Sequence, residues 1–269
     1  MTTGNQFGIK EVFNLVIADP TKKVGDKDDM PKPLYYIDYA ETTTNEVSAE
    51  RIDVRGGHGH FKLLTFDHSK ESQLTVNLPL VDIGFLAMIG GSELVQGSAD
   101  LFHREVVTVE EEETEEVIKL SKEPRKDGDD YSLYLTKLDN TRDFGEEITD
   151  FTVDGKNVTI NNDVNVEKGD QIVAFYMYEA SSTKKVTISS RNFPKTVTMY
   201  GEGLWTDQSN NVVLPVKAVI HRARPQSEFS LTMSGTEATE LELTFDMYGY
   251  KDADGNYTYV DYYVLEEEE

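Results

Sequence analysis

Residues 240–247 read Glu-Leu-Glu-Leu-Thr-Phe-Asp-Met, and every second side chain is apolar. In an extended strand, successive side chains point to opposite faces, so the four apolar side chains share one face. The carboxylates and the threonine share the other face. A sheet with one core face and one solvated face requires this alternation. The stretch therefore predicts an amphipathic β-strand.

The same period-two pattern recurs along the chain and predicts an all-β protein. Residues 227–234 alternate in the same way, and we expect them to form a hairpin with 240–247 through residues 235–239. Asp254-Gly255 predicts a tight turn before the last strand, because glycine adopts positive φ freely. Further strands are expected at 12–17, 34–39, 59–66, 73–78, 157–160, 171–178, 185–189, 196–201, 212–220 and 257–265.

One short helix is expected among these strands. Asp82 is placed to cap the first N–H groups of a helix over Ile83–Ile89, and Gly90-Gly91 is placed to end it. Strands with a single short helix indicate a β-sandwich or a barrel. The segments 19–33 and 40–54 are interpreted as long loops.

Charge divides the chain into two parts. Residues 105–185 hold 21 acidic and 10 basic side chains, including six glutamates in the run 110–116. We interpret 105–185 as a small acidic β domain inserted into a larger, discontinuous β domain, residues 1–104 and 186–269. The open alternative is a long decorated loop, since runs of like charge are typical of solvated segments.

The formal net charge of −24 excludes one class of function. A nucleic-acid reader binds through Lys and Arg that neutralise phosphates, and this chain is acidic. Repulsion of phosphates would suit a protein past which DNA slides, and solubility of a concentrated protein is an equal explanation of the acidic charge.

The chain has no cysteine, which excludes disulfides and thiolate chemistry. It has no signal-like or membrane-spanning apolar run, so we expect it in a cytoplasm.

The pattern of polar residues predicts no catalytic, cofactor-binding or metal-binding residues, and no enzyme. His58 and His60, with His68 and His103, are the candidates for a metal site, but an exposed strand edge has the same pattern and HExxH is absent. Residues 252–256 lack the spacing of a calcium loop and predict a turn.

A basic island interrupts this acidic chain. It consists of His221, Arg222 and Arg224, and we interpret it as a contact surface between subunits. The alternative is an exposed strand end.

Several segments resemble one protein family. They read Lys-Leu-Leu-Thr-Phe-Asp at 62–67, Phe-Leu-Ala-Met-Ile-Gly at 85–90, Val-Asp-Gly-Lys-Asn-Val-Thr-Ile at 153–160, Lys-Gly-Asp-Gln-Ile-Val-Ala-Phe-Tyr at 168–176, Asn-Phe-Pro-Lys-Thr-Val-Thr-Met-Tyr-Gly-Glu at 192–202, Val-Leu-Pro-Val-Lys-Ala-Val-Ile at 213–220 and Phe-Ser-Leu-Thr-Met-Ser-Gly at 229–235. In these patterns the chain resembles bacteriophage tail tube (major tail structural) proteins. The acidic run 110–116 and the glutamate tail 266–269 depart from the family.

The resemblance implies a β-sandwich or half-barrel fold and a structural subunit of the virion, assembled in the host cytoplasm. It implies hexameric rings that stack around a DNA-conducting channel. From the excess of carboxylates we expect the wall of this channel to be net negative, so that DNA travels past it without specific binding. The chain's partners would be further copies of itself and, at the tube's surface and ends, sheath, baseplate or tail terminator proteins. The inserted domain would face outward as a decoration.

Two other functions remain open from the sequence. A capsid decoration or baseplate structural protein would share the β-rich, cysteine-free, acidic profile. A carbohydrate-binding, adhesin-like module would use some of the 14 tyrosines, or Trp205 on an expected loop, to stack on sugars.

Overall fold

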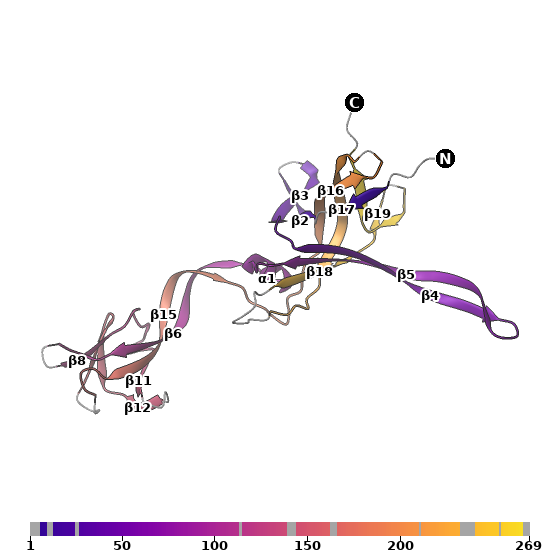
Figure 1. Ribbon diagram of the computed structural model, residues 1–269. Coiled ribbons are helices and arrows are strands. Elements are labelled where there is room, and N and C mark those ends of the chain that lie inside the picture. Colours follow the sequence, from indigo (N-terminus) through magenta and orange to yellow (C-terminus); the bar gives the residue numbers. More distant parts are fainter. Residues whose placement is uncertain are drawn as a thin grey trace. The chain divides into compact units, whose positions relative to one another are not determined.

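The computed structural model describes residues 6–9, 13–24, 27–112, 115–138, 144–161, 166–209, 211–231, 240–252 and 254–265. Over these residues the regular elements are strands, all paired antiparallel, and one α-helix, which confirms the predicted all-β class (Figure 1). The expected turn at 235–239 and the glutamate tail lie outside the described residues.

Two compact units make up the chain. Unit 1 comprises Met1–Leu94 and Val186–Glu269, and unit 2 comprises Val95–Lys185. Residues 95–104, which the charge pattern assigned to the larger domain, group with unit 2, because β6 pairs with β15 from Val95 to Thr108.

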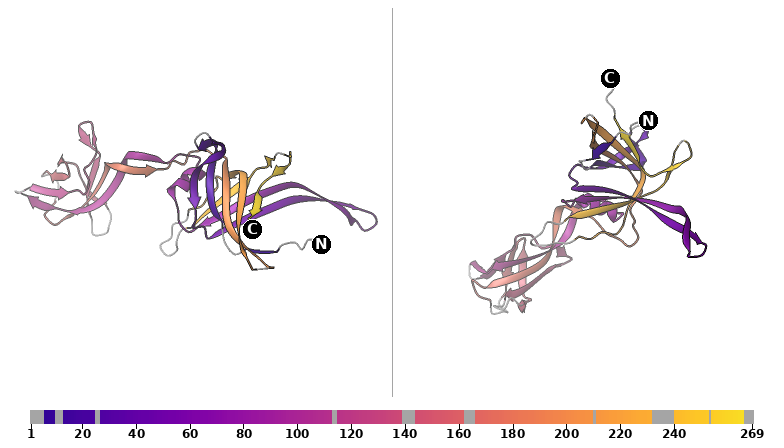
Figure 2. Two further views of the ribbon diagram at one scale, coloured as in Figure 1. Left: turned by 90° about the horizontal axis from the view of Figure 1, so that it is seen from above. Right: turned by 45° about the vertical axis from the view of Figure 1, so that its right-hand side comes forward.

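Unit 1 is built on one large antiparallel sheet. Its order is β3-β2-β16-β17-β18-β5-β4, with β1 beside β16 and β21 beside β17; Figure 2 shows this sheet from two further directions. A separate small hairpin, β19–β20, contains Gly255 at a φ of 91°, which confirms the predicted turn at Asp254-Gly255. The bounds are β1 Phe7–Ile9, β2 Asn14–Val24, β3 Lys27–Ile37, β4 Thr42–Gly56, β5 Phe61–Leu78, β16 Val197–Asp207, β17 Val213–Pro225, β18 Leu241–Met247, β19 Tyr250–Lys251, β20 Tyr257–Thr258 and β21 Asp261–Val264.

The core of unit 1 forms on the face predicted from residues 240–247. All four apolar side chains of β18 are buried, together with Leu74, Val76 and Leu78 of the neighbouring β5. Helix α1, Ile83–Ile89, adds Phe85 and Ile89 to this core. The carboxylate of Asp82 accepts a hydrogen bond from the Gly84 N–H, so the predicted helix and its cap are confirmed.

Several predictions about the strands and loops of unit 1 are wrong. β18 does not pair with residues 227–231, which lie outside the strands; it pairs with β5 and with the end of β17, distant segments whose apolar faces match its own. The segments 19–33 and 40–54, interpreted as loops, lie largely in β2, β3 and β4. Residues 186–189 are not a strand, because β15 ends at Lys185.

Unit 2 contains two four-stranded sheets with a core of its own. The sheet orders are β12-β11-β15-β6 and β13-β14-β8-β7, and a two-stranded pair, β9–β10, lies beside them. Buried residues of both sheets, such as Ile118, Val158, Leu135 and Ile172, belong to one cluster, so the unit is a β-sandwich. The bounds are β6 Val95–Thr108, β7 Glu110–Glu112, β8 Glu115–Lys119, β9 Lys126–Asp127, β10 Asp130–Tyr131, β11 Leu133–Leu138, β12 Phe144–Ile148, β13 Phe151–Asp154, β14 Asn157–Ile160 and β15 Gln171–Lys185.

Candidate assembly surfaces

A long two-stranded ribbon extends from the sheet of unit 1. β5 pairs with β18 only through Ser72–Leu78, whereas its pairing with β4 continues to the Gly56↔Phe61 pair at the tip. Among the described residues, 48–71 therefore form strand pairs only with each other, and we call them the β4–β5 ribbon (Figure 1). An isolated two-stranded ribbon is marginally stable in water, so this segment needs support from its side chains or from a partner.

One face of the β4–β5 ribbon is apolar and exposed. The register places Ile52 opposite Phe66 and Val54 opposite Leu64, and side chains of directly paired residues lie on the same face. Each of these side chains, with Phe61 at the tip, keeps between 41% and 67% of its surface in solvent. We call this set the apolar ribbon face: Ile52, Val54, Phe61, Leu64 and Phe66.

The opposite face of the ribbon is charged and internally neutralised. Arg51 Nε lies 2.9 Å from Asp67, and Lys62 Nζ lies 2.8 Å from Asp53. Hydrogen bonds from Lys62 and from the Thr65 hydroxyl lower the pKa of Asp53 below its usual value. This face is satisfied within the chain, so the need for a partner lies on the apolar ribbon face.

The histidines do not gather into one site. His58 and His60 lie in the turn at the ribbon tip, His68 lies on β5 beside Glu50 at 3.4 Å, and His103 belongs to unit 2. Within the described part of the chain, no group of three or more His, Asp or Glu side chains is arranged to hold a metal ion. No described helix is long and apolar enough to cross a membrane.

The solvated face of the sheet in unit 1 is polar where β4, β5 and β18 run side by side. Gln73 donates a hydrogen bond to Asp246, and Thr75 lies within hydrogen-bond distance of Thr244. Three of its nine side chains are acidic and none is basic. We call this set the polar sheet face: Thr42, Thr44, Glu46, Gln73, Thr75, Asn77, Glu242, Thr244 and Asp246.

The two edge strands of this sheet differ. β3 carries Pro31 and Pro33, which lack the N–H group that a further strand would need. β4 contains no proline over Thr42–Gly56, and among the described residues it pairs only with β5. Its free edge is therefore open to β-pairing with another chain.

The predicted contact residues on β17 already have partners within the chain. His221 lies 3.0 Å from Asp261 and stacks on Tyr250, and Arg224 Nε donates a hydrogen bond to the Pro194 carbonyl. The exposed Arg222 lies over the ring of Tyr248. The island is thus partly occupied in holding the sheet to its neighbouring loops.

Unit 2 presents an acidic hairpin at one end of a sheet. Five of the six glutamates of the run lie in β7 and β8, and the register sets Glu111 opposite Glu116. Like charges directly opposite each other destabilise a strand pair. The ammonium group of Lys168, 3.6 Å from Glu111, partly neutralises this charge. The sequence analysis placed the run in a β domain but predicted no strands in it.

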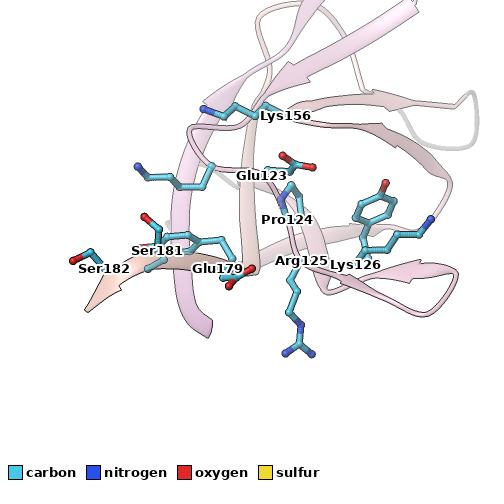
Figure 3. A pocket seen from close by; sticks show the side chains of 12 residues that line it. Glu123, Pro124, Arg125, Lys126, Lys156, Glu179, Ser181 and Ser182 are labelled. Atoms are coloured by element: carbon cyan, nitrogen blue, oxygen red, sulfur yellow. The ribbon is translucent and has the colours of Figure 1, made fainter. Parts of the chain in front are cut away.

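A basic cleft lies elsewhere in unit 2, between the segment after β8 and the middle of β15 (Figure 3). Its volume is about 780 Å³, within the range of ligand-sized sites. Arg125 is held by Asp100 and Asp127, whereas the side chains of Lys122 and Lys156 form no ion pair with any described residue. The charged lining residues are Lys122, Glu123, Arg125, Lys126, Lys156 and Glu179.

A partly buried network holds the segment that forms one wall of this cleft. The Tyr176 hydroxyl donates to Glu105 at 2.5 Å, and the Ser121 N–H donates to the same carboxylate oxygen at 2.9 Å. Burial alone would raise the pKa of Glu105, but these hydrogen bonds outweigh burial and lower it. Burial, with the hydrogen bond to Glu105, raises the pKa of Tyr176, so the phenol remains a donor. The Lys122 N–H donates to the same hydroxyl, which orders the segment that carries the lysines.

Aromatic side chains are exposed on the outer face of unit 2. Phe102 and Phe144, 66% and 64% exposed, both contact Phe175, and Arg104 lies over the same ring.

Trp205 of unit 1 was expected on a loop, and this is wrong: it lies half-buried on β16 against Phe7 and Tyr262. Its ring is thereby occupied by the chain's own aromatic residues.

Comparison with known proteins gives one match. The family model described as the YomU/Tube protein family matches residues 7–260, which span both units. No curated protein matches the chain.

Proposed function

The chain belongs to the YomU/Tube protein family of phage tail tube proteins, and on this premise we propose that its copies stack as rings around a DNA-conducting channel. Hexameric rings are the form that we propose, as in the tail tube proteins that the sequence resembles. The proposed role is structural: the chain is a building block of the tail of a virion and catalyses no reaction.

The apolar ribbon face is the observation that carries this proposal. Five large apolar side chains on one face of an unsupported ribbon are unfavourable in water, and exposed patches of this kind mark interaction sites. A tube subunit has a partner for them in every neighbouring copy. We therefore assign the ribbon to the contact between copies. Since about half of each side chain is still exposed, its burial there stabilises the assembly by about half of the 1.5–3 kcal/mol of full burial.

Ring closure follows from the open edge of β4. A strand edge without proline completes its hydrogen bonds when a neighbouring copy adds a strand. Because a ring of more than two copies requires a head-to-tail contact, the β4 edge of one copy pairs with a different strand of the next copy. We propose that the sheets of adjacent copies join through β4 into a closed barrel, which leaves no such edge open.

The polar sheet face is the wall that we assign to the channel. It carries three carboxylates and no cation, so it repels DNA phosphates within a Debye length of about 8 Å. DNA then passes without binding. A tube structure in which this face is turned outward, or in which lysines line the channel, contradicts the assignment.

Unit 2 is proposed as an outward-facing decoration of the tube. Its own core supports this role, because it does not depend on unit 1 for burial. Sheath, baseplate and tail terminator proteins are the proposed further partners. His221, Arg222 and Arg224 stay a proposed contact between subunits, with Arg222 as the exposed member.

Negative-stain electron microscopy of the concentrated protein tests the function. We expect long tubes of uniform diameter with a central channel. A capsid decoration or baseplate protein gives discrete particles without filaments, and an adhesin-like module stays monomeric and binds glycans. Either result rejects the proposed function.

A further inference from the structure

The charges of unit 2 are unevenly distributed. Val95–Lys185 contains 22 acidic and 11 basic side chains, yet four of those 11 line the basic cleft, against two glutamates. Arg125 is paired with Asp100 and Asp127, so the cations left for a partner are the three lysines of the lining, against its two glutamates. The cleft therefore has a small excess of positive charge in a unit whose net charge is −11. Figure 3 shows Lys156 above the labelled serines, Ser181 and Ser182, and Lys126 on the other side of the cleft.

The acidic hairpin is the complementary feature. Glu111 and Glu116 face each other across β7 and β8, and β8 begins with Glu115 beside Glu112 in the register. Glu110, Glu111 and Glu115 are exposed, so a cationic partner can reach them. A partner that supplies cations would relieve the repulsion within this hairpin.

These two features lie at opposite ends of one strand. β8 begins at the acidic hairpin and ends at Lys119, which pairs with Asn157. The next N–H group, that of Leu120, donates to the carbonyl of Lys156, on the wall of the cleft. Four residues of strand span roughly 13 Å, so the two ends are too far apart to neutralise each other.

We propose that the basic cleft of one copy binds the acidic β7–β8 hairpin of a neighbouring copy. The inference rests on the proposed function, because a stacked tube presents many copies of unit 2 side by side. Opposite charges at the two ends of one sheet suit a head-to-tail contact, in which each unit both donates a hairpin and receives one. The acidic hairpin complements the charge of the cleft, and in a tube every copy has neighbours that carry this hairpin.

Carbodiimide cross-linking of assembled tubes tests this contact. The reagent joins a lysine to a carboxylate that touches it, and tubes made from an equal mixture of ¹⁵N-labelled and unlabelled chains distinguish links between copies from links within one. We expect links between copies that join Lys122, Lys126 or Lys156 to Glu110, Glu111 or Glu115. Lys122→Glu combined with Lys156→Glu should reduce the links that still start from Lys126 by about tenfold, because attraction becomes repulsion.

Paired charge reversal provides the control. A chain with Glu111→Lys and Glu115→Lys should accept the reversed cleft of the first variant, and links should reappear in tubes mixed from the two variants. Normal tubes whose links lie only within one copy, or join other residues, overturn the contact and leave the tube function intact. Tubes that bind added polyglutamate at the cleft without links between copies overturn it as well and assign the cleft to an external anion. Absence of tubes rejects the proposed function and the contact with it.

Discussion

The β4–β5 ribbon and the β7–β8 hairpin are both two-stranded, but each is incomplete in a different way. The ribbon pairs its charges within the chain, as Arg51 does with Asp67, and exposes its apolar face. The hairpin sets Glu111 against Glu116 and has Lys168 as its nearest cation. The first therefore requires an apolar partner and the second a cationic one.

This difference separates two kinds of contact in one assembly. Apolar contacts persist or strengthen at high salt, whereas contacts between exposed charges are screened within about 3 Å at 1 M salt. The ribbon is suited to a contact that holds rings together. The hairpin is suited to an adjustable contact at the tube surface.

The largest effect is expected on the apolar ribbon face. Leu64→Ser combined with Phe66→Ser should abolish tubes, because every copy loses two apolar side chains from its contact. Electron microscopy and sedimentation measure the loss, and circular dichroism should show an unchanged β-sheet. The matched control, Thr65→Ser with Asp67→Asn on the charged face, should still form tubes. Tubes from the first variant would remove the ribbon from the assembly contact.

Unit 2 should be separable from tube formation. Leu135→Ala removes a fully buried side chain from its core and should lower the free energy of unfolding of unit 2 by about 2–5 kcal/mol. Thermal unfolding should show one transition shifted to lower temperature while tubes still form below it. Loss of tubes at temperatures where unit 2 is folded would show that the units are coupled.

Salt should distinguish the two contacts. Raising NaCl from 50 mM to 1 M should reduce cross-links between the cleft and the hairpin by roughly fivefold, since exposed charges are screened. Tube length in the same samples should stay constant or increase. Tubes that dissolve at 1 M NaCl would show that the ring contact is ionic. The proposed difference between an apolar ring contact and an ionic cleft–hairpin contact would then be wrong.

A smaller effect is expected at the wall of the cleft. Glu105→Gln keeps the shape of the side chain but removes the charge that accepts from Tyr176, at a cost of about 1 kcal/mol at pH 7. The pKa of Glu105 is lowered in the folded chain, so its contribution is complete above pH 4.5 and is lost as the pH falls further. Urea unfolding should therefore show a smaller deficit of the variant at pH 3 than at pH 7. An equal deficit at both pH values would assign it to packing.

The smallest effect is expected on the charged face of the ribbon. Arg51→Ala removes an ion pair whose side chains are 71% and 60% exposed, and exposed pairs contribute about 0–1 kcal/mol. Tubes should form normally, and the unfolding temperature should change little. A loss of assembly comparable to that of the Leu64 and Phe66 variant would mean that both faces of the ribbon are buried between copies.

Local patterns in the sequence predicted the elements whose causes are local. The alternation in β18 predicted its core face, and Asp82 and Gly90 predicted both ends of α1, because a strand face and a helix cap depend on residues close in sequence. The partners of β18 were predicted wrongly. Pairing with β5, more than 160 residues away, is favoured by matching apolar faces, and a single sequence does not encode which matching face is chosen.

The candidate surfaces likewise combine residues that are recognisable in the sequence with contacts that depend on distant segments. The basic island on β17 was visible as residues, but its stacking on Tyr250 and its bond to Pro194 depend on distant loops. The basic cleft gave no sequence signal, because Lys122 and Lys156 are distant in sequence and meet only when β8 pairs with β14. In the sequence, lysines scattered through an acidic segment are typical of a solvated surface. Only the folded β-sandwich brings them together at one cleft.

The sequence by itself determined that this protein is all-β, acidic, free of cysteine and similar to tail tube proteins, since composition and period-two alternation are properties of the chain alone. Only the tertiary structure decided which faces are left without a partner. Segment 40–54, interpreted as a loop, lies mostly in β4, which continues from the sheet into the ribbon. Its apolar side chains Ile52 and Val54 are exposed because no described layer of unit 1 covers them. Burial is a property of the folded arrangement. The exposed apolar surface that is available for assembly is therefore also decided by the fold.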